Sequence, residues 1–114
     1  MLISNLELIR HIKDEVDFVL QNTIGKTKEE VTDDMILCRA VVRSIEIIGE
    51  ASKKLSEDFK TAHPGIEWKK IGRTRDKLIH DYFGIDYDII WDIITGKLPN
   101  LQAYVDRLVI EPGK

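Results

Sequence analysis

Apolar residues recur along the chain three and four positions apart, which is the spacing that one face of an α-helix produces. No stretch sustains the alternation of a half-buried β-strand, and no Asn-Gly or Asp-Gly pair marks a hairpin. The pattern predicts a first helix that starts at a capping box formed by Ser4 and Glu7 and ends at Gly25. Its apolar stripe consists of Leu6, Ile9, Ile12, Val16, Val19 and Leu20.

The longest predicted element is a second helix near the middle of the chain. A further capping-box pattern, from Thr27 to Glu30, opens the connection to it. We expect this helix to start near Thr32 or Asp33 and to run to about Phe59. Its apolar stripe consists of Leu37, Val41, Ile45, Ile48, Ser52 and Leu55.

Turn residues separate the second helix from a third. The His-Pro-Gly sequence at 63–65 is a turn signal. The third helix is expected to run from about Trp68 to Tyr82 or Phe83, with Gly84 as its stop.

Two more helices complete the prediction. Asp86 would cap a fourth helix that stops at Gly96, and Pro99 would lie in the first turn of a fifth, where proline is tolerated. Their apolar positions are Ile89, Ile90, Trp91, Ile93 and Ile94, and then Leu98, Leu101, Val105 and Leu108. The whole pattern predicts an all-α, up-and-down bundle of four principal helices plus a short additional helix.

The bulk properties fit one domain spanning residues 1–114. Hydrophobic residues make up 43% and charged residues 32%, an ordinary balance for a globular protein. Acidic residues interrupt the first thirty positions, which argues against a signal peptide, and no apolar run approaches the roughly 20 residues that span a bilayer. The single cysteine, Cys38, has no disulfide partner. We therefore expect a cytoplasmic protein without membrane association.

Charge is unevenly distributed in this acidic chain, whose net charge is −3. Between Lys60 and His80, six lysines and arginines stand against two carboxylates. Such a basic segment can bind a phosphate backbone, although a solvated helix face explains the charge equally well. The candidates for contacts with an RNA backbone are Lys69, Lys70, Arg73 and Lys77.

The run from Arg75 to Tyr82 combines three chemically useful side chains in eight residues. Arginine binds phosphate, histidine transfers protons near neutral pH, and tyrosine offers a hydroxyl. On a straight helix, Arg75 and Tyr82 share a face, but His80 lies about 140° away from Arg75. Either the helix is distorted there or the arginine and histidine meet across a symmetric dimer.

Asp76 lies four positions before His80 and shares its helical face. Its carboxylate could accept a hydrogen bond from the imidazole, which would fix the tautomer and raise the pKa of His80. The structural alternative is a surface histidine paired with Asp76, an arginine in an ion pair and a half-buried tyrosine, and the spacing alone favours it.

A second polar constellation lies on the second predicted helix. Arg39, Arg43, Glu46 and Glu50 are spaced four, three and four positions apart and form one stripe. A solvated ladder of ion pairs is the simpler interpretation. Alternatively, Arg43, Glu46 and Glu50 form a polar wall of the cleft that holds Arg75 and His80.

Metal or cofactor chemistry has little support in the sequence. The three histidines, His11, His63 and His80, lie far apart, and none has a second histidine or cysteine at ligand spacing. No phosphate-binding glycine loop and no nucleophile elbow are present. We therefore expect no metal and no cofactor.

The signature Arg75-x-x-x-x-His80-x-Tyr82 resembles that of the HepT-like toxins in the HEPN superfamily, the "higher eukaryotes and prokaryotes nucleotide-binding" domains. The resemblance covers nearly the whole chain, and the other stretches that match in order and spacing are 43–51, 68–71, 83–86 and 98–99. One position departs from the family, which often has asparagine where this chain has Asp76. A carboxylate there could orient His80, or it could weaken the binding of RNA.

The resemblance implies a dimeric HEPN-like helical bundle in which two signatures face each other across a cleft. It implies a metal-independent ribonuclease with Arg75 and His80 as catalytic residues and Tyr82 as a supporting residue. HepT-like toxins are paired with an antitoxin that bears a minimal nucleotidyltransferase domain, and this antitoxin can transfer AMP to the signature tyrosine, here Tyr82. The alternative function is a non-catalytic HEPN module that docks a nucleotidyltransferase and helps to bind its substrate.

Overall fold

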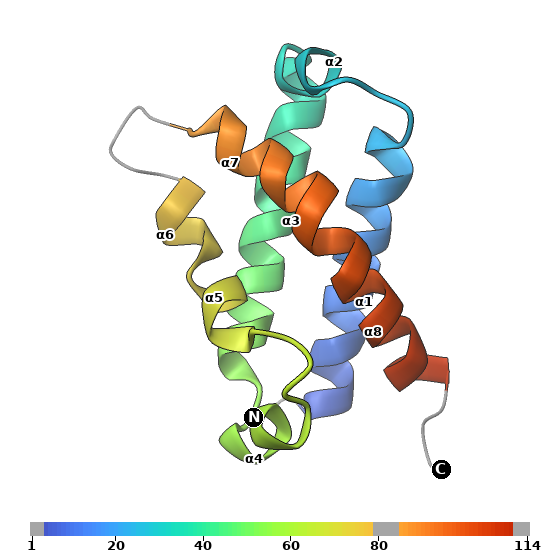
Figure 1. The fold of residues 1–114 in the computed structure, drawn as a ribbon, viewed down its shortest axis with the longest axis vertical. Coiled ribbons are helices and arrows are strands. Elements are labelled where there is room, and N and C mark those ends of the chain that lie inside the picture. The colour runs from blue at the N-terminus through green and yellow to red at the C-terminus, as the bar shows by residue number, and fades with distance from the viewer. Residues whose placement is uncertain (1–3, 79–84, 111–114) are drawn as a thin grey trace.

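The computed structural model describes residues 4–78 and 85–110, apart from the side chains of Arg75 and Ile110. Two long helices, α1 (Asn5–Thr23) and α3 (Met35–Lys54), lie side by side and are joined through α2 (Lys28–Thr32). The remaining elements in chain order are α4 (Glu57–Ala62), α5 (Trp68–Gly72), α6 (Thr74–Leu78), α7 (Tyr87–Asp92), the π-helix η1 (Ile93–Lys97) and α8 (Leu98–Ile110) (Figure 1). No β-strand occurs in the described residues, so the predicted all-α bundle is confirmed.

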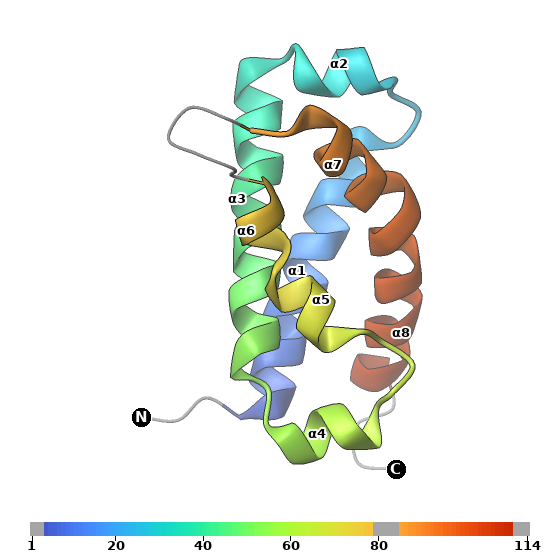
Figure 2. The same ribbon diagram turned by 60° about the vertical axis from the view of Figure 1, so that its left-hand side comes forward.

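The core lies between α1, α3 and α8. In the turned view α1 runs between α3 and α8, and the short helices α5 and α6 lie alongside α3 (Figure 2). Ile12, Val41 and Val105 are completely inaccessible to solvent, one from each long helix. Burial of such apolar side chains, at about 25 cal/mol per Å², is the main force that holds the bundle together.

The predicted helix starts are largely confirmed. The Ser4 hydroxyl accepts a hydrogen bond from the Glu7 N–H at 3.1 Å, and both halves of the Thr27 capping box are formed. The first helix ends at Thr23, just before Gly25, whose φ of 76° suits glycine. The long helix starts later than predicted, because Asp34 rather than Thr32 or Asp33 is its N-cap.

The predicted extension of the long helix to Phe59 is wrong. Helix α3 ends at Lys54, and Ser56 becomes the N-cap of α4 by accepting from the Phe59 N–H at 3.1 Å. Asn5 holds this break in place, since its side chain accepts from the Ser56 N–H at 3.1 Å and donates to the Ser56 hydroxyl at 3.0 Å. The contact comes from a residue 51 positions away, which periodicity cannot detect.

The predicted third helix is also wrong in its described part, because it divides into α5 and α6 at Arg73. The Thr74 hydroxyl donates to the Ile71 carbonyl at 2.6 Å. Such a side-chain bond competes with the backbone hydrogen bonds that would continue a regular helix. At the same place α5 packs closely on α3, where a side chain on Gly49 would lie 3.2 Å from the Ile71 carbonyl oxygen. The rest of this predicted helix and its Gly84 stop lie outside the described residues.

The predicted stop at Gly96 is wrong as well. The chain passes from α7 through η1 into α8 without leaving the helical path (Figure 1). The Leu98 N–H donates to the Ile93 carbonyl five residues back, which is the π-helical hydrogen bond. Pro99 has no N–H and its ring would clash with the carbonyl of an ordinary helical turn, so the wider turn accommodates it. The predicted cap at Asp86 is confirmed, because its carboxylate accepts from the Ile89 N–H at 3.1 Å.

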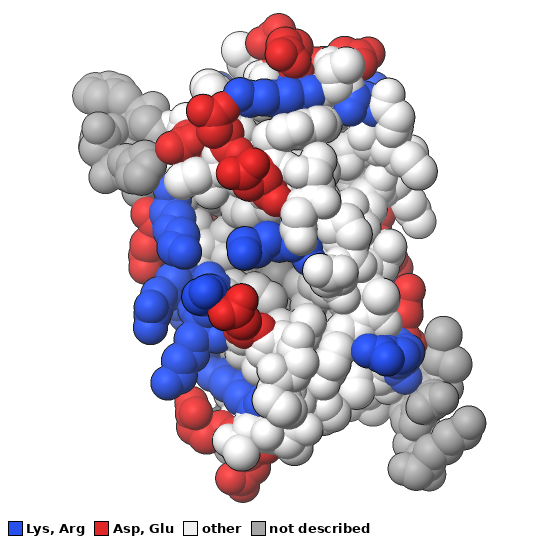
Figure 3. Space-filling model, viewed as in Figure 1, with Lys and Arg blue, Asp and Glu red and all other residues white. Residues whose placement is uncertain are grey.

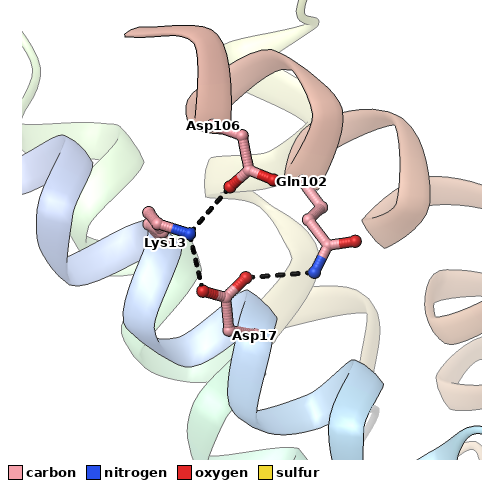
Figure 4. Close-up of polar contacts among 4 residues, drawn as sticks. All are labelled: Lys13, Asp17, Gln102 and Asp106. Atoms are coloured by element: carbon pink, nitrogen blue, oxygen red, sulfur yellow. Dashed lines mark hydrogen bonds and ion pairs between the residues drawn. The ribbon is translucent and has the colours of Figure 1, made fainter. Parts of the chain in front are cut away.

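A polar cluster joins α1 to α8 (Figure 4). The Lys13 ammonium donates to Asp17 at 2.7 Å and to Asp106 at 2.8 Å, and Gln102 donates to the second oxygen of Asp17 at 3.0 Å. The hydrogen bonds to Asp106 and Asp17 raise the pKa of Lys13. Burial opposes ionisation of Asp17, but hydrogen bonds from Lys13 and Gln102 outweigh it and lower the pKa of Asp17. No helix in the described part of the chain is both long and apolar enough to cross a membrane.

Candidate functional site

Helix α6 carries the arginine of the signature. Arg75 is the second residue of this helix, and Leu78 anchors the helix in the core with no exposed surface. The Leu78 carbonyl accepts a hydrogen bond from the Asp86 N–H at 3.0 Å. This bond joins the last residue of α6 to the N-cap residue of α7. His80 and Tyr82 themselves lie outside the described residues, so their predicted roles stay predictions.

The division between α5 and α6 lies before Arg75, so it leaves the expected angle between Arg75 and His80 unchanged. The estimate of about 140° between Arg75 and His80 assumed one straight helix. In the structure a new helix begins at Thr74, directly before Arg75. Asp76 is exposed in the first turn of this helix. Its predicted contact with His80 lies outside the described residues.

A cationic groove lies between α4 and α5 and extends to Arg73, the residue before α6. Its larger hollow has a volume of about 480 Å³, and a smaller adjoining hollow has about 180 Å³. The cations that line the two hollows are Lys53, Lys60, Lys69, Lys70 and Arg73, and the carboxylates are Glu57 and Glu67. Cations therefore outnumber carboxylates, and the groove can attract a polyanion.

Only some of these cations are matched by a carboxylate. Lys70 pairs with Glu67 at 2.9 Å, and the largely buried Lys60 pairs with Glu57 at 3.6 Å. Lys69 and Arg73 are exposed and form no ion pair with the residues that the structure describes. Their charges remain available for phosphate groups.

The surrounding lysines lower the pKa of Glu67. A hydrogen bond from Lys70 lowers the pKa of this carboxyl, and the nearby charges of Lys97 and Lys77 lower it further. Lys77 is exposed on α6, directly after Asp76. The space-filling view shows lysine and arginine side chains gathered along the edge formed by α5 and α6 (Figure 3). Of the four predicted backbone-contact residues, Lys69, Lys70 and Arg73 line the groove, and Lys77 follows on α6.

Two cations of the groove are not among the residues that the sequence predicted to contact RNA. Lys60 comes from α4 and Lys53 from the last turn of α3. The Lys60 ammonium donates to the Lys53 carbonyl at 3.4 Å, and this bond links α4 to the end of α3. In the sequence, Lys60 is the first residue of the basic segment. It lines the same hollows as Lys69 only because the helix breaks at Ser56 and α4 starts there.

The polar stripe on α3 does not form the complete ladder that the sequence suggested. Glu50 pairs with Lys53 at 3.8 Å. Arg39 and Arg43 are exposed and have no ion pair among the described residues. Glu46 is half-buried and lies toward the side of α3 on which α5 and α6 pack. The stripe therefore borders the helix that carries Arg75.

Together the fold and the groove define a small helical protein with a surface suited to a phosphate-rich polymer. The comparisons with known proteins narrow this class. The family model "Ribonuclease HepT-like" matches residues 8–108. The chain belongs to this family of ribonucleases in the HEPN superfamily.

Relatives from three organisms agree with the family match. A protein of Methanocaldococcus jannaschii that is named as a candidate RNase is 48% identical over 103 residues, covering 90% of this chain and 82% of the relative. A candidate RNase of Caldanaerobacter subterraneus is 43% identical over 101 residues, covering 89% and 90%. The "Probable ribonuclease HepT" of Thermococcus cleftensis is 36% identical over 105 residues, covering 92% and 96%. No solved structure shows a significant match.

Proposed function

We propose that the chain is a metal-independent endoribonuclease that acts as the toxin of a toxin–antitoxin pair. The observation that carries the proposal is a cationic groove that extends to Arg73, two residues before Arg75, in a member of a ribonuclease family. A strand of RNA that lies along Lys69 and Arg73 would follow α5 to the start of the helix that carries Arg75. RNA is the expected substrate because its own 2′-OH supplies the nucleophile.

The chemistry follows from the three side chains of the signature. His80 accepts the proton of the 2′-OH, whose oxygen attacks the adjacent phosphorus. Arg75 stabilises the added negative charge on the five-coordinate phosphate, and Tyr82 positions the phosphate by a hydrogen bond. The 5′-oxygen of the next nucleotide leaves and takes a proton. The products are a 2′,3′-cyclic phosphate and a free 5′-OH.

The proposed catalytic unit is a homodimer in which two signatures line one cleft. Its cognate antitoxin is a minimal nucleotidyltransferase that transfers AMP to Tyr82. The added phosphodiester would carry a negative charge into a region whose cations attract RNA, and would repel the substrate. Arg43, Glu46 and Glu50 would form the polar wall of this cleft, since the stripe borders α6.

A second candidate function rests on Asp76. This exposed carboxylate follows Arg75 directly and lowers the local positive charge. It favours a non-catalytic module that docks a nucleotidyltransferase and helps to bind its substrate. Such a module would bind its partner tightly and leave RNA intact.

Product chemistry decides between the two candidates. Purified protein is incubated with end-labelled RNA in excess EDTA, and the new ends are identified. We expect a 2′,3′-cyclic phosphate, and we expect no cleavage of the same RNA with 2′-O-methyl groups. Intact RNA, with tight binding of the nucleotidyltransferase, would support the second candidate. Cleavage of the methylated RNA would rule out attack by the 2′-OH.

A further inference from the structure

The exposed face of α3 has an arrangement of charge that suits a second copy of itself. The buried residues of α3 occupy roughly half of the helix circumference, from Cys38 through Ser52. The opposite face spans about 120° and contains the stripe together with Ile36, Ala40 and Ile47. Ile36 is 84% exposed, so this face offers apolar surface to a partner.

The order of charges along this face is the critical feature. The two arginines, Arg39 and Arg43, come first, and the two glutamates, Glu46 and Glu50, follow. The pairs 39 with 50 and 43 with 46 have the same midpoint, between residues 44 and 45. A two-fold axis at that midpoint would therefore place each arginine of one copy opposite a glutamate of the other.

We propose that α3 packs antiparallel on the α3 of a second copy, with Arg39 opposite the partner's Glu50 and Arg43 opposite the partner's Glu46. This inference rests on the proposed function, since it specifies how the homodimer of that function is built. Exposed ion pairs contribute little affinity, so the charges set the register while Ile36 and Ile47 supply apolar contact. A carboxylate has two oxygens, so Glu46 can accept from the partner's Arg43 whatever else it contacts.

The location of α6 gives this register a functional meaning. Helix α5 packs at the level of Gly49, and α6 continues from it toward the start of α3 (Figures 1 and 2). Helix α6 thus lies beside the middle of α3, near the proposed axis. The same two-fold operation would bring the two helices that carry Arg75 to one side of the interface.

The face of α3 alone is smaller than a standard interface. A helix of 20 residues is about 30 Å long and about 10 Å wide, so one face offers roughly 300 Å². A standard interface buries about 800 Å² on each partner. Elements beside α3 must contribute the rest, and α6 is the neighbour that follows the charged stripe.

Charge reversal tests the register directly. The variant R39E/R43E makes the stripe entirely acidic, and E46R/E50R makes it entirely basic. We expect each variant alone to dimerise at least about a hundredfold more weakly than the wild type in sedimentation velocity, because like charges would face each other. We expect an equimolar mixture of the two to form a heterodimer with nearly wild-type affinity. The exposed double variant R10E/K26E, outside α3, should leave dimerisation unchanged.

The outcomes separate this inference from the proposed function. Circular dichroism first establishes that the variants are folded, and recovery in the mixture shows that each subunit is competent. A monomeric wild type, or two reversal variants that both dimerise normally, would overturn the α3 register. RNA cleavage by such a protein would leave the proposed ribonuclease chemistry intact. A wild-type dimer with the predicted register that leaves RNA uncut would support the α3 register and contradict the proposed ribonuclease activity.

Discussion

Two charged regions of this molecule use the same residue types in different ways. In the α1–α8 cluster, Lys13 lies between Asp17 and Asp106, and each charge is matched by a hydrogen-bonded partner. In the α4–α5 groove, cations outnumber carboxylates, and Lys69 and Arg73 have no carboxylate partner in the described residues. Matched charge joins two helices, whereas unmatched charge is retained on a surface where it can meet phosphate.

The difference also separates stability from binding. Unmatched cations beside each other repel, so their removal should not weaken the fold. Removal of the central cation of a matched cluster leaves carboxylates facing each other with no counter-charge. Substitutions in the two regions should therefore have nearly opposite profiles in unfolding and in RNA-binding experiments.

The largest expected effect on binding comes from the groove. Replacing Lys69 and Arg73 together with glutamine should weaken the binding of single-stranded RNA roughly tenfold at low salt, because two phosphate contacts are lost. The slope of log K against log salt should become shallower by about 1.4. Fluorescence anisotropy over a series of salt concentrations measures both quantities. The double variant R10Q/K26Q removes the same charge elsewhere and should bind RNA as the wild type does. Equal losses in both variants would contradict a specific role of the groove.

The next effect is on the fold. Lys13→Met should lower the free energy of unfolding by about 1–3 kcal/mol, because two partly buried carboxylates lose their shared donor. The melting temperature should fall by about 4 °C per kcal/mol. RNA affinity of the folded variant should stay unchanged. A variant of wild-type stability would show that the cluster in Figure 4 contributes nothing to the bundle.

A smaller effect should appear in acid. The pKa of Asp17 is lowered in the folded protein from its ordinary value of 3.8, so its contribution is present above that value and is lost as pH falls through the folded pKa. Asp17→Asn should cost about 1 kcal/mol at neutral pH and progressively less below about pH 4. Urea unfolding at several pH values gives the comparison. A cost that is independent of pH would mean that the carboxylate charge is not responsible.

The smallest effect concerns the carboxylate next to Arg75. Asp76→Asn should tighten RNA binding about two- to threefold at low salt, with little difference at high salt, because the exposed charge is screened. If Asp76 also orients His80, the variant should bind more tightly and yet cleave more slowly. Asp14→Asn on α1 is the matched control. Weaker binding by the Asp76 variant alone would contradict the electrostatic argument.

Local signals in the sequence predicted the starts of helices well. The caps at Ser4, Thr27 and Asp86 depend on residues within three positions, and each is formed. The breaks were not predictable in the same way. The break at Ser56 depends on Asn5, and the break before Thr74 coincides with the close approach of α5 to α3. A periodic apolar pattern predicts that a helix continues until a local stop signal appears. These two breaks depend instead on contacts between distant parts of the chain, which the pattern does not contain.

The candidate site likewise combines residues that local sequence predicts with residues that only the tertiary fold brings in. The basic positions from Lys69 to Lys77 were visible in the sequence because they are neighbours in the chain. Lys53 and Lys60 join them only through the packing of α3 and α4 against α5. The roles of His80 and Tyr82 come from the family signature, since five-residue spacing on a straight helix gives no convergent site.

Single-turnover cleavage by His80→Ala, with RNA affinity measured on the same preparation in EDTA, separates catalysis by His80 from binding in the groove. We expect a loss of at least about a hundredfold in the cleavage rate constant, with unchanged affinity, because a general acid–base contributes about that much or more. The K69Q/R73Q variant should show the reverse, with weaker binding and a nearly unchanged rate constant at saturation. A folded His80→Ala protein that cleaves bound RNA at the wild-type rate would rule out His80 as the general acid or base.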